Sequence, residues 1–189
     1  MDPRQPRPLV AAAALSILSG LLVLSLPARA MVLEALPLRE LTRRVDLVVH
    51  GEVLGQTTRR ESDGHTLWTR TRVRIVETFK GSCPAGELTF DQLGGTLDGL
   101  TELIPGDASF QPGEEVVVFL ARTPKGFVLY GFSEGKFTVG YDPALGSTFV
   151  RRDLSNVGLV TRGGQPLPAS YAPARLEDFR AEIRSYANR

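Results

Sequence analysis

Residues 67–75 read LWTRTRVRI, and their two-residue period decides the fold class. The odd-numbered positions hold apolar residues or threonines, whereas every even-numbered position holds a tryptophan or an arginine. The even-numbered residues are Trp68, Arg70, Arg72 and Arg74. Successive side chains of a β-strand point to opposite faces, so this alternation is typical of a sheet with one buried and one solvated side. The stretch predicts a mostly β protein with antiparallel pairing.

The sequence on either side supplies turns and partner strands. Asp63-Gly64 precedes the stretch, and an Asp-Gly pair favours a tight hairpin turn. Residues 46–54, DLVVHGEVL, form a β-branched partner strand, with Gly51 at a position where a strand bulges or bends. Further strands are predicted at 87–93, 115–121, 126–132, 136–140 and 147–151. Short strands between frequent turns are typical of a small barrel or sandwich.

Two helices flank the predicted strands. Residues 37–44 show helical spacing of apolar side chains after a proline, and residues 175–189 carry an apolar stripe. The stripe consists of Leu176, Phe179, Ile183 and Tyr186. We therefore expect residues 31–152 to form one β-domain with a short leading helix. The Gly- and Pro-rich segment 153–174 is expected to connect this domain to the C-terminal helix.

The first thirty residues have the features of an export signal. Two arginines precede an apolar run over 9–26, and Ala28-Arg29-Ala30 forms a small-x-small cleavage site. These features predict a signal peptide over 1–30 and a periplasmic or secreted protein with no membrane span after cleavage. The alternative is an uncleaved anchor, because a run of 18 residues lies within the roughly 17–25 that span a bilayer.

Charge and cysteine content exclude several classes of function. Three arginines and one aspartate leave with residues 1–30, which changes the formal net charge from +1 to −1. No global field then attracts nucleic acid or anionic lipid. Cys83 is the only cysteine, so an exported chain has no internal disulfide and must fold by burial and sheet pairing. A nucleophilic thiol needs a basic partner, and no histidine lies near Cys83 in the sequence.

Sequence patterns for catalysis, metal binding and cofactors are incomplete. Residues 131–135, GFSEG, match G-x-S-x-G, but the hydrolase motif needs a helix after the serine and a histidine later in the chain. The strand-like residues 136–140 follow instead, and His50 and His65 lie upstream. These histidines lack metal-ligand spacing, and residues 94–99 contain neither a dinucleotide-binding glycine motif nor a Walker lysine. We therefore predict a non-catalytic protein with no metal and no cofactor.

The solvated face of residues 67–75 has two interpretations. Trp68 beside Arg70 and Arg72 has the composition of a surface that binds single-stranded nucleic acid or a glycan. The alternative is a solvated face whose arginines pair with carboxylates across the sheet, such as Glu52 on the preceding strand. The export signal and the net charge favour the second interpretation, so we predict no nucleic-acid partner.

Three further segments share a pattern of strand ends and turns. They read RVDLVVHGEV (44–53), TRVRIVETFKG (71–81) and FQPGEEVVVFL (110–120). Their order resembles the small OB-like barrels of the netrin and tissue-inhibitor-of-metalloproteinase type, and also exported bacterial proteins in which FSEGKF (132–137) completes the barrel. The resemblance implies a small antiparallel OB-like barrel with a short N-terminal helix and a C-terminal helix. Those inhibitors chelate a protease zinc through an N-terminal cysteine that residues 31–189 lack, so no site residue is transferred.

The loop 94–111 is the predicted recognition site. Long irregular loops on rigid scaffolds concentrate binding residues, and this loop has more apolar residues than a solvated connection needs. These residues are Leu97, Leu100, Leu103, Ile104 and Phe110. We expect an inhibitor-like or protein-interaction module that binds another exported protein, with its oligomeric state left open. Alternatively, the same side chains fold back and close the end of the barrel.

A small enzyme is the rival class of function. Its site would gather carboxylates such as Asp91, Asp98 and Glu134 in one pocket, where they would act as acid and base. Convergence of these side chains would favour an enzyme, and their separation would favour a binding module.

Overall fold

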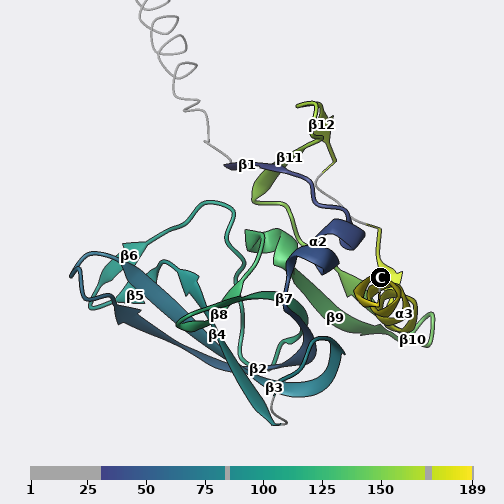
Figure 1. The fold of residues 1–189 in the computed structure, drawn as a ribbon, viewed down its shortest axis with the longest axis horizontal. Helices are drawn as coiled ribbons and strands as arrows, with labels where there is room; N and C mark the ends of the chain where they lie inside the picture. The colour runs from purple at the N-terminus through teal and green to yellow at the C-terminus, as the bar shows by residue number, and fades with distance from the viewer. Residues whose placement is uncertain (1–30, 84–85, 169–171, 189) are drawn as a thin grey trace, which may run out of the picture.

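The computed structural model describes residues 31–83, 86–168 and 172–188, so the signal peptide predicted for 1–30 lies outside the described part. Within that part the chain is mostly β, as predicted, and has two α-helices (Figure 1). The helical elements are α2 (Leu38–Arg44), the 3₁₀ helix η2 (Phe132–Gly135) and α3 (Leu176–Ala187). The strands are β1 (Met31–Glu34), β2 (Leu47–Arg60), β3 (Leu67–Lys80), β4 (Glu87–Leu93), β5 (Gly95–Leu97), β6 (Leu100–Glu102), β7 (Glu115–Thr123), β8 (Gly126–Leu129), β9 (Lys136–Asp142), β10 (Ser147–Arg151), β11 (Val157–Val160), β12 (Pro166–Leu167) and β13 (Ala174–Arg175).

The LWTRTRVRI stretch begins β3, which pairs with β2 in a long antiparallel hairpin. Its arginines are exposed, whereas Leu67 and Val73 are fully buried, so the predicted alternation is confirmed. The predicted turn is also present. The Asp63 carboxylate accepts hydrogen bonds from the backbone N–H groups of His65 and Thr66 at 2.8 and 2.9 Å, which fixes the turn.

Gly51 marks a bulge in β2, as expected from its place in the sequence. The register of β2 against β3 shifts between His50 and Gly51. A Cβ atom at Gly51 would lie 2.4 Å from the carbonyl oxygen of Arg74 and 2.5 Å from Cγ1 of Val73. Only glycine allows the two strands to approach this closely.

The main sheet has eight strands in the order β13-β10-β9-β7-β2-β3-β4-β8. Strands β2, β3 and β4 are consecutive antiparallel neighbours, and β7 pairs antiparallel with β2. The last strand, β8, pairs in parallel with β4 and antiparallel with β7. The sheet therefore curls, so that a strand at its edge also contacts a strand in its middle.

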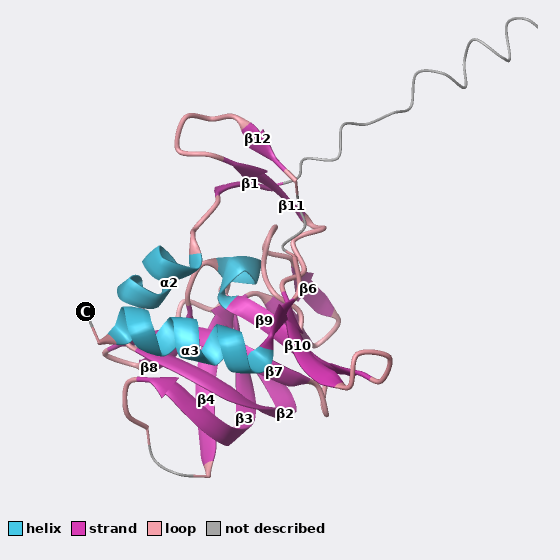
Figure 2. Cartoon of the chain, turned by 90° about the vertical axis from the view of Figure 1, so that its right-hand side faces the viewer, coloured by secondary structure: helices cyan, strands magenta, loops and turns pink. Residues whose placement is uncertain are grey.

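Two apolar clusters fill the two sides of the sheet. One packs residues of β7, β9 and β10 against α2 and α3, which lie side by side across these strands (Figure 2). Phe179 and Ile183, from the predicted stripe of the C-terminal helix, are buried there. The other cluster lies on the opposite face and includes Phe90. Adjacent residues Val48 and Val49 are both 0% exposed, because β2 is covered on both faces.

The loop 94–111 is more regular than predicted. Its first half is a hairpin of β5 and β6, joined by Asp98 and Gly99, whose φ angles are 52° and 76°. Two consecutive positive φ angles are typical of a type I′ turn, for which Asp-Gly is a preferred pair. The prediction of an irregular loop is wrong for this half, because strands of three residues are too short to show an alternation.

The segment 153–174, predicted as a connector, also contains strands. Strands β11 and β12 form a small sheet with β1 (Figure 1), and β13 pairs with β10. Strands β1 and β11 are parallel, with Met31 opposite Val157. This pairing joins two segments that lie far apart in the sequence, so no local periodicity announces it. Strand β1 thereby lies outside the main sheet, although the sequence placed it in the same β-domain.

The strand predicted for residues 126–132 ends earlier, at Leu129. Gly131 and Phe132 have φ angles of 77° and 55°, which turn the chain into η2 before β9 begins. The apolar pattern predicts the strand, but it does not show where the backbone leaves the extended conformation.

Candidate functional site

Part of the loop 94–111 belongs to the core. Phe110 is 3% exposed, and its ring packs edge-on against Phe90 at a centroid distance of 5.3 Å. Leu97 and Ile104 are half-buried. Phe110 therefore packs into the core and is not part of an exposed binding surface.

Two leucines of the loop 94–111 and one at the adjoining end of β4 face solvent. Leu100 and Leu103 are 50% and 83% exposed. Leu93, at the end of β4, is 43% exposed and lines the same groove as Leu103. We call Leu93, Leu100 and Leu103 the leucine rim. Exposed leucines scattered singly are ordinary, whereas three gathered at one groove and its hairpin are typical of a contact surface.

Hydrogen bonds hold the β5–β6 hairpin against β3. The Gly94 N–H donates to the carbonyl of Leu67 at 2.8 Å, and the Leu67 N–H donates to Oε2 of Glu102 at 2.8 Å. Oγ1 of Thr69 donates to the carbonyl of Gly94 at 2.8 Å. A Cβ atom at Gly95 would lie 2.2 Å from that same Oγ1, so glycine is required for this approach. The hairpin is thus positioned before any partner binds.

A groove of about 460 Å³ runs between the loop and the ends of β2, β3 and β4. Thr58 and Thr69 line it and are hydrogen-bonded through their hydroxyl groups at 3.0 Å. Nε2 of Gln92 donates to Oδ1 of Asp107 at 2.7 Å and to the carbonyl of Ala108 at 3.0 Å. The groove therefore offers hydroxyl and amide groups beside apolar side chains, a combination suited to polypeptide recognition.

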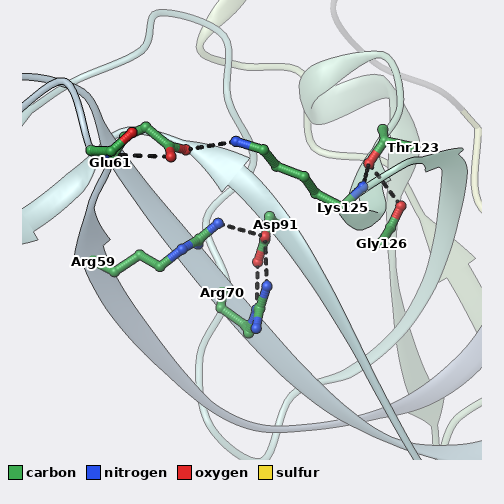
Figure 3. Close-up of polar contacts among 8 residues, drawn as sticks. Arg59, Glu61, Arg70, Asp91, Thr123, Lys125 and Gly126 are labelled. Carbon is green, nitrogen blue, oxygen red and sulfur yellow. Dashed lines mark hydrogen bonds and ion pairs between the residues drawn. The ribbon is translucent and has the colours of Figure 1, made fainter.

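Asp91 binds two arginines on the outer face of the sheet (Figure 3). Arg70 donates to both carboxylate oxygens at 2.7 and 2.9 Å, and Arg59 donates to Oδ2 at 3.0 Å. Burial raises the pKa of Asp91, but the hydrogen bonds and charges of Arg70 and Arg59 outweigh it and lower the pKa below its usual value. Beside this cluster, Lys125 donates to Glu61 at 3.3 Å (Figure 3).

The other arginines of the predicted stripe are paired as well. Arg74 donates to Glu52 at 2.7 Å, which is the cross-sheet pair expected from the sequence. Arg72 lies 3.5 Å from Glu87 on β4. Trp68, at the end of the stripe, is half-buried. Carboxylates of neighbouring strands thus balance this face, and the structure supports the interpretation as a cross-paired sheet surface.

The carboxylates considered for an enzyme lie in three different environments. Asp91 pairs with arginines, and Asp98 occupies the exposed β5–β6 turn. Glu134 is buried, where its Oε1 accepts a hydrogen bond from the Leu36 N–H at 2.9 Å and lies 3.5 Å from Nη1 of Arg152. Burial raises the pKa of Glu134, and the Leu36 hydrogen bond and the Arg152 charge offset part of the rise. The three groups do not form an acid–base pair.

Ser133 and the histidines do not form a nucleophilic site. The 3₁₀ helix η2 leads into strand β9, as the sequence predicts, and not into a helix. His50 Nε2 lies 2.6 Å from Oε1 of Glu115, and His65 is exposed. Among the described residues, no three His, Cys, Asp or Glu side chains are grouped so as to hold a metal ion. The described part also contains no helix with the length and apolarity to cross a bilayer.

Two features of the site differ in how far the sequence signals them. Asp98-Gly99 repeats the hairpin signal of Asp63-Gly64, so the β5–β6 turn could have been predicted from it. The exposure of Leu93 has no such signal, because an apolar residue at the end of an apolar strand can face either way.

Comparisons with known proteins return no match, since no protein-family model, no curated protein and no solved structure matches this chain.

Proposed function

We propose that residues 31–189 are an exported, non-catalytic module with an OB-like barrel that binds another exported protein through the leucine rim. The observation that carries the proposal is the 83% exposure of Leu103 beside a hairpin that hydrogen bonds already hold in place. The arginines, apolar run and cleavage site of residues 1–30 support export to the periplasm or the extracellular space.

The order of strand pairing supports the barrel. Strands β2, β3 and β4 form an antiparallel meander, β4 pairs with β8, β8 with β7, and β7 with β2. Following these pairs leads back to the first strand, as a five-stranded OB barrel requires. Two residue pairs join β4 to β8, Phe90 with Phe127 and Asp91 with Val128, and so short a contact suits a partly open barrel.

The netrin-like and inhibitor-like resemblance enters the proposal only as a fold. Zinc chelation by those inhibitors needs a cysteine at the mature N-terminus, whereas Cys83 lies beside Thr78, with 3.4 Å between Sγ and Oγ1. Recognition through the leucine rim needs no such cysteine. It relies on apolar side chains that a partner covers.

A preformed apolar rim favours binding because little ordering is required. Burying an exposed leucine side chain contributes about 1.5–3 kcal/mol, and immobilising one costs about 0.5–1.5 kcal/mol. Since Leu100 is 50% and Leu103 83% exposed, the two together contribute on the order of 1 kcal/mol to an interface, or roughly fivefold in Kd.

The double variant Leu100→Ser, Leu103→Ser tests the proposal, with Leu145→Ser as the matched control. Leu145 is 61% exposed on the turn between β9 and β10, so the control also removes an exposed leucine. Each protein is immobilised and exposed to the exported proteins of the source organism, and the Kd of the captured protein is then measured. We expect the double variant to keep the parental melting temperature and to lose binding roughly fivefold or more, while the control keeps both.

Two outcomes would contradict the proposal. Equal capture by the parental protein and the double variant would exclude the leucine rim as the contact surface. A clear fall in melting temperature with unchanged capture would assign Leu100 and Leu103 to the core.

A further inference from the structure

Strand β6 has a free edge beside the groove. Among the described strands it pairs with β5 alone, in a two-stranded sheet. A two-residue turn joins these strands, so Leu97 and Leu100, which flank the turn, form a hydrogen-bonded pair. Hydrogen-bonded and non-hydrogen-bonded pairs alternate along an antiparallel ladder, so the next pair, Thr96 and Thr101, points its backbone N–H and C=O groups outward.

The side chains of this pair agree with the outward orientation. The hydroxyl oxygens of Thr96 and Thr101 lie 3.0 Å apart, and side chains approach most closely in a non-hydrogen-bonded pair. Thr101 is exposed, and its backbone N–H and C=O groups have no hydrogen-bond partner among the described residues. Such an edge is a template on which another extended chain adds as a strand.

The groove beside this edge is acidic. Glu102 and Asp107 are the charged residues that line it. Oε2 of Glu102 accepts a hydrogen bond from the Leu67 N–H, and Oδ1 of Asp107 accepts one from Gln92, which also lines the groove. Neither carboxylate forms an ion pair within the described part of the chain. A partner segment with basic residues therefore complements the groove.

Charge also argues against a second copy of this chain as the occupant. Pairing of two β6 strands would bring the two copies of Glu102 close together. The side chain of Asp98, at the tip of the same hairpin, is 80% exposed and lies 3.9 Å from Nη2 of Arg60, so it adds further negative charge at this end. Like charges across an interface are unfavourable, whereas a basic segment would be attracted.

We propose that an extended, basic segment of the partner polypeptide adds to β6 as a third strand, and that its apolar residues cover the leucine rim. This inference rests on the proposed function, since it describes how the partner of that surface binds. Main-chain hydrogen bonds to Thr101 hold the segment, and Glu102 and Asp107 select its basic residues.

Three matched hexapeptides test the proposal by NMR titration of the purified protein. The first is acetyl-Lys-Lys-Val-Val-Lys-Lys-amide, in which each face of the extended chain carries a valine between two lysines. The second has glutamates in place of the lysines, and the third has serines in place of the valines. We expect the lysine–valine peptide to bind saturably, and the second and third to bind at least about tenfold and about threefold more weakly.

Variants of Thr101 separate the backbone from the side chain. Thr101→Pro removes the outward N–H, which β5 does not use, whereas Thr101→Val keeps this N–H and removes the hydroxyl group. Thr101→Pro should weaken binding of the lysine–valine peptide about fivefold, and Thr101→Val should leave it unchanged.

A second pair of variants tests the charge. Glu102→Gln keeps an acceptor oxygen for the Leu67 N–H and should weaken binding of the lysine–valine peptide about twofold. Glu177→Gln removes an exposed charge from α3, at the opposite end of the molecule (Figure 1), and should have no effect.

Hydrogen exchange of the parental protein gives a readout that needs no variant. Saturation with the lysine–valine peptide should slow exchange of the Thr101 amide at least about fivefold and leave that of the exposed Gly163 unchanged. This measurement decides the outcome if Thr101→Pro lowers the melting temperature. Slower exchange at Thr101 with rising protein concentration, without peptide, would assign the edge to a second copy and overturn the proposal.

Other outcomes would also overturn strand addition. These are the absence of saturable binding of the lysine–valine peptide, equal binding by folded Thr101→Pro and Thr101→Val, and unchanged exchange at Thr101. The proposed function fails on a different result, equal capture by the parental protein and the variant with serines at Leu100 and Leu103. Loss of capture in that variant with full capture by Thr101→Pro would keep the leucine rim and reject strand addition.

Discussion

Phe179→Ala tests whether α3 is part of the folded core. Phe179 is 3% exposed, and its ring centroid lies 4.6 Å from that of Phe137 and 6.4 Å from that of Phe119. These contacts join the helix to β9 and β7 in the cluster that covers one face of the sheet. Truncation removes both aromatic contacts and leaves a void under the helix.

The size of the effect follows from the surroundings of the ring. Truncating a buried phenylalanine costs about 3–5 kcal/mol, and each aromatic pair accounts for about 0.5–1.5 kcal/mol. Phe179 also lines a pocket of about 390 Å³, so the new void opens into existing space and is not a sealed cavity. We therefore expect a loss of about 3–4 kcal/mol in the free energy of unfolding.

Urea unfolding at neutral pH measures this loss. With a slope of about 2 kcal/mol per molar urea, the midpoint of Phe179→Ala should fall by roughly 1.5–2 M. Leu145→Ala, on the exposed turn between β9 and β10, should stay within about 0.5 kcal/mol of the parental protein. Identical midpoints for Phe179→Ala and the parental protein would refute the docking of α3.

Three further substitutions have effects of known sign. Gly51→Ala should cost at least about 1–3 kcal/mol by thermal unfolding, because the new methyl group meets a backbone oxygen at 2.4 Å, whereas Gly55→Ala, with no atom within 4 Å, should change little. The lowered pKa of Asp91 means that its charge stabilises the fold above the unfolded pKa of about 3.9, and that this contribution is lost as the pH falls through the folded pKa. Because Arg70 is half exposed, Asp91→Asn should cost no more than about 1–2 kcal/mol in urea unfolding at pH 7, and the difference should shrink as the pH falls through the folded pKa of Asp91. The raised pKa of Asp107 has the opposite sign: its protonation favours folding at low pH, and this contribution is lost as the pH rises through the folded pKa. Asp107→Asn should thus be more stable than the parental protein at pH 7, and an equal gain at pH 3 would contradict this reasoning.

The sequence by itself determined the local elements. The alternation over 67–75, the Asp63-Gly64 turn and the apolar stripe around Phe179 each predict a strand, a hairpin or a helix that the structure contains. These patterns succeed because backbone geometry sets a period of 2 in strands and 3.6 in helices. The role of Gly51 was also recognisable from the sequence. Glycine inside a strand often marks a bulge or a place where another backbone approaches closely.

Only the tertiary structure decided which elements meet and which side chains stay exposed. The pairing of β1 with β11 depends on residues that lie far apart in the sequence, so neither strand could be assigned from its neighbours. Phe110 and Leu103 belong to one apolar loop, yet Phe110 packs on Phe90 while Leu103 faces solvent. The same holds for Asp107, which is partly buried because the loop packs against η2 and β4, and which forms no ion pair with the described residues. Burial depends on contacts between distant segments, and a local sequence pattern contains no record of those contacts.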